Sequence, residues 1–111
     1  MTRFNFGLFA EYFTILVYRI MFYQILYHRK RYYVGEIDII VARGKQIIFI
    51  EVKARTGIVD DRLLSTNQQY RIKRSAELFL SNNLQYQNYH IRFDLVIIRP
   101  YRLPRIIKNA W

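Results

Sequence analysis

The chain has 111 residues, of which 52% are hydrophobic and 23% are charged, so it can form one small domain with an apolar core and is not a disordered tail. Its 18 Lys and Arg against 8 Asp and Glu give a net charge of +10, which favours a polyanionic partner, either nucleic acid or an anionic membrane surface. The absence of cysteine excludes disulfides, thiolate nucleophiles and cysteine zinc sites, and two histidines are too few for a His-rich metal cage.

The first predicted element is a helix over residues 5–18, where apolar side chains recur at helical spacing. Residues 8–27 are the most apolar stretch of the chain. A membrane span is disfavoured there because Arg19 would sit near its centre, and no small-residue cleavage site follows that would indicate a secretory signal. We therefore expect an amphipathic core helix in a cytoplasmic protein.

Three strands are predicted next. Residues 21–28 are rich in aromatic and β-branched side chains, and the basic residues 28–31 then form a solvated bend or the end of the strand. Residues 35–42 and 46–54 are two further strands, and the Gly44-Lys45 pair between them is typical of a two-residue hairpin turn. Residues 55–64 are expected to form a loop.

The second half of the chain predicts a helix, a strand and a basic tail. Ser65 and Gln68 form a capping pattern that begins a helix running to about Leu80. Residues 90–98 form a last strand whose apolar run indicates burial on both faces. The order α-β-β-β-α-β predicts a single α/β domain over residues 1–111, a mixed sheet flanked by helices.

The positions of the acidic residues in the predicted hairpin point to a chemical site. Pairing across the Gly44-Lys45 turn places Asp38 opposite Glu51 and Glu36 opposite Lys53, all on one face of the sheet. Two facing carboxylates about 5 Å apart repel each other. Among the surrounding isoleucines, such a pair persists if one carboxylate holds a proton or if a hard dication such as magnesium binds between them.

Lys53 lies two residues beyond Glu51 on the same face, where an ammonium group could orient an attacking water or neutralise charge on a phosphate oxygen. Two acids and a lysine in this arrangement form a compact phosphodiester-cleaving set. The alternative interpretation is a structural Glu36–Lys53 salt bridge, with Asp38 and Glu51 at a wet edge of the sheet.

Residues 35–40 (GEIDII) and 49–55 (FIEVKAR) resemble the signature of the YraN-like bacterial protein family UPF0102, which is similar to the restriction-endonuclease-like PD-(D/E)xK nucleases and to Holliday-junction resolvases. Residues 7–11, 69–72 and 92–96 also resemble family segments. The chain departs from the wider pattern at Ile37, where the nucleases carry proline, and at Thr14 and residues 65–68.

The resemblance implies a restriction-endonuclease-like fold and a role for each matching residue. Asp38 and Glu51 would be metal ligands together with the backbone carbonyl of Val52, and Lys53 would be the catalytic lysine. Glu11 would be an additional catalytic acid from the first helix, and Gln69 would approach the site from the second helix. The residues alone leave open that Glu11 is a solvated helix charge and that Gln69 caps its helix. For Asp94, a salt bridge with Arg92 is the favoured interpretation.

Several basic groups are expected to contact phosphates, and nothing indicates sequence-specific base readout. We expect nucleic-acid contacts from Arg55, Arg71, Lys73 and Arg74. Four tyrosines lie near the basic groups, namely Tyr32, Tyr33, Tyr70 and Tyr101. They could stack on unpaired bases, or they could simply fill the core.

The sequence therefore leads to the hypothesis of an endonuclease that depends on Mg²⁺ (or Mn²⁺), needs no small-molecule cofactor and hydrolyses branched or single-stranded DNA. Resolvase-like enzymes cut two symmetric strands, so a homodimer is compatible with this hypothesis. One alternative is a nucleic-acid-binding module without turnover. The other is a membrane-surface protein that uses its aromatic N-terminus, which the charge placement makes the weaker interpretation.

Overall fold

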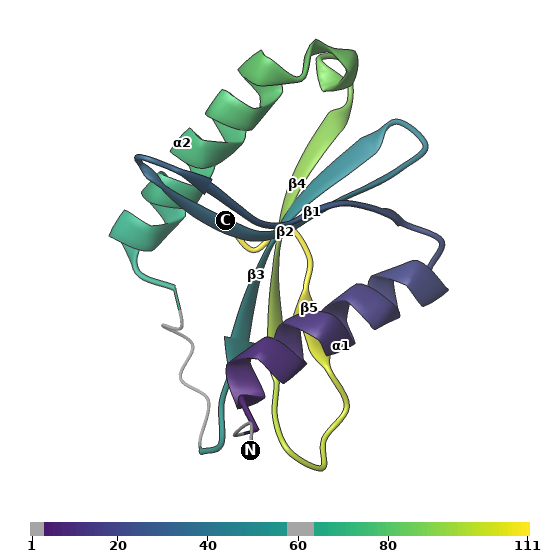
Figure 1. Cartoon of the computed structure of the whole chain (residues 1–111), viewed down its shortest axis with the longest axis vertical. Helices are drawn as coiled ribbons and strands as arrows, with labels where there is room; N and C mark the ends of the chain where they lie inside the picture. Colours follow the sequence, from purple (N-terminus) through teal and green to yellow (C-terminus); the bar gives the residue numbers. More distant parts are fainter. Residues whose placement is uncertain (1–3, 58–63) are drawn as a thin grey trace.

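A five-stranded mixed sheet with the strand order β1-β2-β3-β4-β5 forms the centre of the structure, a computed structural model that describes residues 4–57 and 64–111 (Figure 1). Neighbouring strands are antiparallel except β3 and β4, which run parallel. The strands are β1 (Gln24–Tyr32), β2 (Gly35–Arg43), β3 (Gln46–Ala54), β4 (His90–Ile98) and β5 (Arg105–Ile107).

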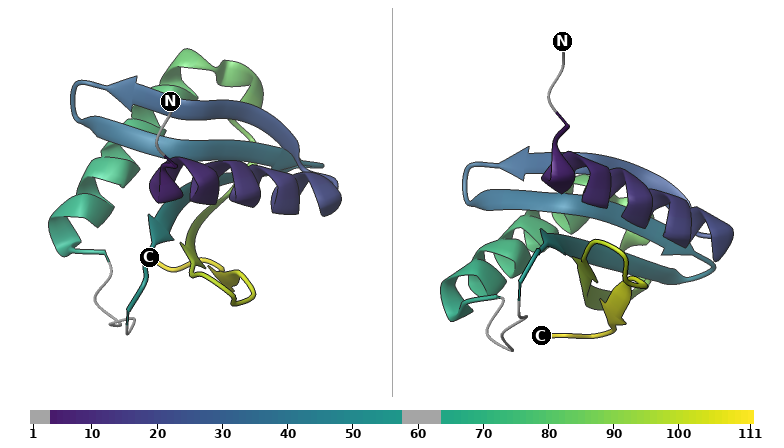
Figure 2. Two further views of the ribbon diagram at one scale, coloured as in Figure 1. Left: turned by 60° about the horizontal axis from the view of Figure 1, so that its bottom comes forward. Right: turned by 90° about the horizontal axis from the view of Figure 1, so that it is seen from below.

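Two helices cover the sheet, α1 (Phe6–Ile20) and α2 (Thr66–Asn82), and a short 3-10 helix (Leu84–Tyr86) follows α2 (Figure 2). Each helix belongs to its own apolar cluster. Ala10 and Ile15 of α1 pack with Ile39 and Ile50, whereas α2 contributes to a second cluster that contains Ile37, Ile40, Ile47, Phe49, Ile72, Ala76 and Phe79. The central strands therefore supply apolar side chains to two cores.

No helix within residues 4–57 and 64–111 is long and apolar enough to cross a bilayer.

The predicted α/β fold class and element order are confirmed, and β3 and β4 have the predicted bounds. Ser65 caps α2 as expected, because its side chain accepts from the Gln68 N–H at 3.1 Å while the Gln68 side chain accepts from the Ser65 N–H at 3.1 Å. The hairpin turn is also as predicted. Gly44 takes a φ of 60°, a conformation that costs glycine little.

The first strand was predicted too early. Helix α1 continues to Ile20 and the chain turns through Phe22, whose φ is 69°, so β1 begins at Gln24. It runs through the basic cluster 28–31 and ends at Tyr32, because an edge strand tolerates Lys and Arg that alternate toward solvent. Most of the loop predicted over 55–64 lies outside the described residues.

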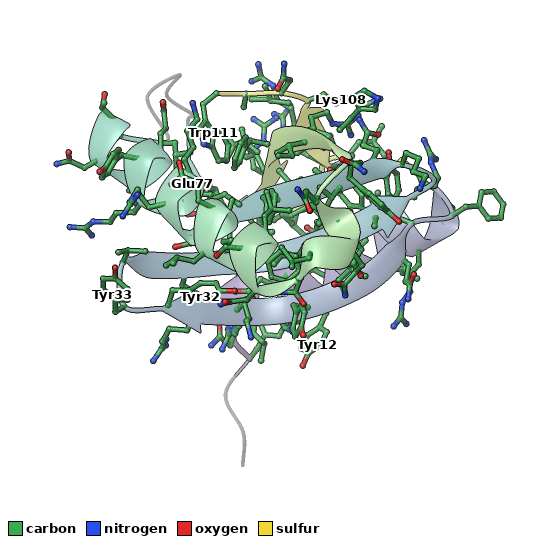
Figure 3. All side chains as sticks on the ribbon, turned by 90° about the horizontal axis from the view of Figure 1, so that it is seen from above. Tyr12, Tyr32, Tyr33, Glu77, Lys108 and Trp111 are labelled. Carbon is green, nitrogen blue, oxygen red and sulfur yellow. The ribbon has the colours of Figure 1, made fainter. Side chains whose placement is uncertain are left out.

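The basic tail after β4 is partly structured, which the sequence did not predict. Arg105–Ile107 form β5 on the edge of β4, and Ala110 N–H donates to the Phe93 carbonyl at 2.7 Å. The Trp111 ring then lies 5.4 Å from the Phe93 ring, centroid to centroid, tilted by 35°, and packs against the apolar cluster of α2 (Figure 3). The tail thus closes the β4 edge of the sheet.

Helix α2 approaches β2 closely at Gly35. A Cβ at this position would lie 3.2 Å from Arg71 Cβ and 3.2 Å from Ser75 Oγ. A side chain on residue 35 would push α2 away from the sheet. Glycine at the start of β2 therefore sets the distance between the helix and the strand that carries Asp38.

Asp94 is completely buried and forms the predicted ion pair with Arg92, with both N···O distances at 2.8 Å. The same carboxylate accepts from the Tyr18 hydroxyl at 2.8 Å and from the Asn109 N–H at 3.1 Å. This network joins α1, β4 and the tail. Asp94 therefore has a structural role.

We expect Asp94→Ala to lower the free energy of unfolding by about 3–5 kcal/mol, because it leaves the Arg92 guanidinium half-buried without its partner. Tyr18→Phe removes one hydrogen bond and should cost only about 1 kcal/mol. Urea unfolding followed by far-UV circular dichroism measures both. Equal losses in the two variants would contradict the central position of Asp94.

Candidate active site

Strands β2 and β3 separate at the position of the predicted acidic pair. Their pairing runs from Arg43–Gln46 to Ile39–Ile50, in the predicted register, and extends no further. Beyond this point β3 remains paired with β4, up to Ala54–Ile98. The expected direct oppositions of Asp38 with Glu51 and of Glu36 with Lys53 are therefore not part of the ladder, because β3 follows β4 and leaves β2.

The side chain of Asp38 bridges this separation. Its Oδ2 accepts a hydrogen bond from the Val52 N–H at 2.8 Å, in place of the missing backbone partner. The N–H and C=O of one strand residue point to the same side of the strand. The Val52 carbonyl is therefore directed toward the same gap as the Asp38 carboxylate.

Glu51 lies against Asp38, and the two carboxyl groups share a hydrogen bond. Burial, the nearby Asp38 charge and this hydrogen bond raise the pKa of Glu51 to about 9. The pKa of Asp38 is also raised, mainly by burial, although the Val52 N–H and the hydrogen bond with Glu51 act in the opposite direction. Both shifts favour a proton on the pair, which would relieve the repulsion between the two carboxylates.

Lys53 is the nearest cationic side chain to this pair. Its Nζ lies 3.7 Å from Glu51 Oε1, and both side chains are only 15% exposed. The Lys53 charge opposes the rise of the Glu51 pKa without cancelling it. The structure therefore brings together Asp38, Glu51 and Lys53, while Glu36 pairs with Arg31 at 3.1 Å.

A pocket of about 160 Å³ opens beside Glu51, between the sheet and α2. Glu36 and Gly35 line its strand side, and Gln68 and Arg71 line its helix side, together with Leu64 and Ile72. Arg71 brings positive charge to the carboxylate pair. The pocket thus combines one arginine with the two acids Glu36 and Glu51.

The donor set in the gap suits a hard dication. It offers two carboxylates and a backbone carbonyl, which are the oxygen ligands that Mg²⁺ prefers. A cation between Asp38 and Glu51 would relieve the repulsion of their carboxylates, as a proton does. Over residues 4–57 and 64–111, no group of three or more His, Asp or Glu side chains could hold a metal ion. A cation in the gap would have Asp38, Glu51 and the Val52 carbonyl as its protein ligands.

Glu11 does not join the carboxylate pair in a direct contact. It is 14% exposed, with Oε1 2.6 Å from His28 Nε2 and 3.0 Å from Arg29 Nε. Burial alone would raise the pKa of Glu11, but hydrogen bonds from Arg29 and His28 hold it below its ordinary value. The charge of Glu11 still acts on Asp38 and contributes to the raised pKa there.

The two partners of Glu11 were not identified from the sequence. Arg29 has a φ of 60°, which is uncommon for a residue with a side chain, although the register of β1 with β2 is the same on either side of it. This conformation accompanies its contact with Glu11 of α1. No local sequence signal could have shown it, since it depends on the packing of α1 on β1.

Gln69 is half-buried and donates to the Leu64 carbonyl at 3.2 Å, so it stabilises the approach to α2. Its neighbour Gln68 lines the pocket beside Glu51 while it completes the capping box. The sequence had identified Gln68 only as a cap. Its position one turn before Arg71 and Ile72, on the face of α2 that meets the sheet, is the signal that could have found it.

The residues predicted to bind nucleic acid have different surroundings. Arg71 lines the pocket, Arg74 pairs with Glu77 at 3.1 Å, and the exposed Lys73 lies 6.0 Å from the Phe93 ring centroid. Arg55 donates to the Ala54 carbonyl at 2.9 Å at the end of β3. Among the four tyrosines, Tyr32 is half-buried in the α2 core, whereas Tyr33, Tyr70 and Tyr101 are exposed.

Fold and site together define an α/β protein that carries a buried carboxylate pair where two central strands separate. Residues 10–98 match the model of the uncharacterised protein family UPF0102. The chain belongs to this family, which confirms the family resemblance of the GEIDII and FIEVKAR segments.

Curated relatives cover most of the chain. A UPF0102 protein of Parvibaculum lavamentivorans is 35% identical over 112 residues, which cover 100% of this chain and 84% of the relative. A UPF0102 protein of Rhizobium meliloti is 36% identical over 106 residues, which cover 95% of this chain and 87% of the relative. A UPF0102 protein of Rhodopseudomonas palustris is 41% identical over 90 residues, which cover 80% of this chain and 69% of the relative.

The raised pKa of Glu51 predicts a pH-dependent stability in the absence of metal. The folded protein keeps this proton up to about pH 9, whereas the unfolded chain loses it near 4.5, so the contribution is complete below about pH 4.5 and is lost as the pH rises toward 9. Glu51→Gln removes this titration. Relative to the parent, we expect its free energy of unfolding to increase by more than about 1 kcal/mol between about pH 5 and pH 8.

Urea unfolding at a series of pH values, in the presence of a chelator, measures this difference. Glu77→Gln is the matched control, since the Glu77 side chain is 65% exposed and its neutralisation should leave the slope unchanged. Parallel pH profiles for the parent and Glu51→Gln would show that Glu51 is ionised in the folded protein, contrary to the prediction.

Proposed function

We propose that this protein is a metal-dependent endonuclease that hydrolyses phosphodiester bonds of DNA with branched or single-stranded regions. The observation that supports this most is the Asp38–Glu51 pair, buried next to Lys53 and beneath an arginine-bearing helix. Two acids held together in this way are costly unless a cation or a proton binds them. Perturbed carboxylates of this kind are concentrated at functional sites.

Each group of the site would have a separate role. Asp38, Glu51 and the Val52 carbonyl would hold Mg²⁺ or Mn²⁺, and Glu51 would have to release its proton to do so. A bound dication would supply Lewis acidity toward the phosphodiester. Lys53, which lies 3.7 Å from Glu51, would neutralise charge that develops on a phosphate oxygen.

The charge distribution supports a phosphate backbone as the ligand. The chain has a net charge of +10, and Arg71 lines the pocket that opens beside Glu51. Glu36 also lines this pocket, and its surface ion pair with Arg31 at 3.1 Å offsets its charge only weakly. With Glu51 protonated, Arg71 would give an entering phosphate a cationic partner beside the carboxylate pair.

Two substitutions of Asp38 test the proposal. Asp38→Ala removes both the ligand and the acceptor of the Val52 N–H, whereas Asp38→Asn keeps an acceptor oxygen and loses only the charge. We expect each to reduce Mg²⁺-dependent cleavage of four-way junction, single-stranded and duplex DNA at least about a hundredfold. DNA binding should be equal or tighter, because a negative charge near the phosphates is removed.

Cleavage is followed on denaturing gels with Mg²⁺, with Mn²⁺ and with a chelator. Glu77→Gln is the control with one surface acid neutralised: because it frees Arg74, it should bind DNA as tightly as the parent or more tightly, yet keep the parent's cleavage rate. The assignment of Asp38 fails if both variants cut like the parent. The proposed nuclease activity is contradicted if the parent yields no products on any of the three substrates.

Lys53→Met tests the role of the ammonium group separately. The cleavage rate should decrease about 10²-fold, with little change in DNA binding, because the group acts on charge that forms during the reaction. Lys108→Met removes the same charge from an exposed position and is the matched control. A loss of binding that equals the loss of rate would instead assign Lys53 to substrate affinity.

A nucleic-acid-binding module without turnover is the second candidate. It is favoured by the shared proton, which satisfies the carboxylate pair without a metal, and by the lack of a third acidic or histidine ligand within residues 4–57 and 64–111. Under this alternative the parent would bind DNA with a steep salt dependence and yield no products at any metal concentration.

A further inference from the structure

A second groove adjoins the pocket of the carboxylate pair. It has a volume of about 450 Å³ and lies between the turn that joins β1 to β2 and the first half of α2. Its lining residues are Tyr33, Val34, Asn67, Tyr70, Arg71 and Arg74. Arg71 also lines the pocket beside Glu51, so the groove and the pocket share this side chain.

Two tyrosine rings from separate elements are exposed along this groove. Tyr33 in the turn is 87% exposed and Tyr70 on α2 is 64% exposed, whereas Tyr18 is fully buried in the core. Figure 3 shows Tyr33 at the outer end of the β1–β2 hairpin, on the same side of the molecule as the first turns of α2. The two rings are thus available to a ligand and contribute little to the core.

The charge of the groove is positive. Arg71 and Arg74 are its charged residues, and none of its lining residues is acidic. Arg74 lies 3.1 Å from Glu77, but both side chains are well exposed, and surface ion pairs of this kind contribute little. A phosphate could therefore take the place of Glu77 on the Arg74 guanidinium.

Aromatic rings interleaved with arginines in a concave surface suit single-stranded nucleic acid, whose unpaired bases stack on the rings while its phosphates are neutralised. A lipid surface would instead need a protruding apolar patch. Exposed apolar side chains of that kind lie on α1 and the turn after it, including Phe9, Leu16, Ile20 and Phe22. This groove is formed on the α2 side.

We propose that the groove between the β1–β2 turn and α2 binds unpaired bases of a nucleic-acid strand, with stacking on Tyr33 and Tyr70 and phosphate contacts to Arg71 and Arg74. The strand would continue at Arg71 into the pocket of the carboxylate pair. The continuation of the strand into this pocket rests on the proposed function. The binding of unpaired bases in the groove requires no hydrolysis.

The test uses fluorescence anisotropy with a labelled oligothymidylate and a blunt duplex of equal length, with a chelator present. Tyr33→Ala and Tyr70→Ala should each weaken binding of the single strand about fivefold or more, and binding of the duplex less than about twofold, because duplex bases are already stacked. Tyr33→Phe and Tyr70→Phe should bind like the parent, since they keep the ring.

Tyr101→Ala is the matched control. Tyr101 is more exposed than Tyr33 and Tyr70 and lies beside Arg99 and Arg102, in the loop after β4 and outside the groove. Its loss should change binding of the single strand and of the duplex by less than about twofold each. Parent-like binding by both alanine variants of the groove, an equal effect on the duplex, or an equal effect of Tyr101→Ala would each overturn the proposal.

The same variants separate this inference from the proposed function. If Asp38→Asn abolishes cleavage while the groove variants bind like the parent, the nuclease assignment stands and the groove proposal fails. If the groove variants lose single-strand binding and the parent cuts nothing, the groove proposal stands and the nuclease assignment fails. Thermal unfolding of each variant confirms that it folds.

Discussion

The hydrogen bond from the Val52 N–H to the Asp38 carboxylate joins β2 and β3 at the point where their backbones separate. Without it, a backbone donor would be left unsatisfied inside a partly buried gap. Once Asp38 is fixed there, Glu51 on the neighbouring strand must lie against it. The electrostatics of the site follow from this one contact, because a second carboxylate cannot ionise freely beside the first.

The two helices give the gap different surroundings on the two sides of the sheet. Helix α1 contributes Glu11, which is held by His28 and Arg29 and whose charge reaches Asp38. Helix α2 approaches closely at Gly35 and brings Arg71 to the pocket beside Glu51. The carboxylate pair therefore lies between an acid that is already paired and an arginine that lines an open pocket.

Local signals explain what the sequence could predict. The Gly44-Lys45 turn determines the register of β2 and β3, and Ser65 with Gln68 determines where α2 begins. The separation of β2 from β3 was not predictable in this way, since it depends on the parallel pairing of β3 with β4, a strand that comes much later in the chain. The contact of Glu11 with Arg29 likewise depends on the packing of α1 and on a left-handed residue within a strand. The three-residue β5 is too short to give a periodic signal.

The charges around the pocket explain why a proton and a dication are the two alternatives for this pair. With Glu51 protonated, the charges of Asp38 and Glu36 remain, and two cations lie close by, because Lys53 is 3.7 Å from Glu51 and Arg71 lines the pocket. Removal of the Glu51 proton adds a negative charge that Lys53 alone does not compensate, since the pKa of Glu51 stays raised beside it. A monovalent cation would compensate for no more charge than the proton does. A dication would compensate for both carboxylates and leave Lys53 and Arg71 to a phosphate, which is the condition that the proposed phosphodiester hydrolysis would require.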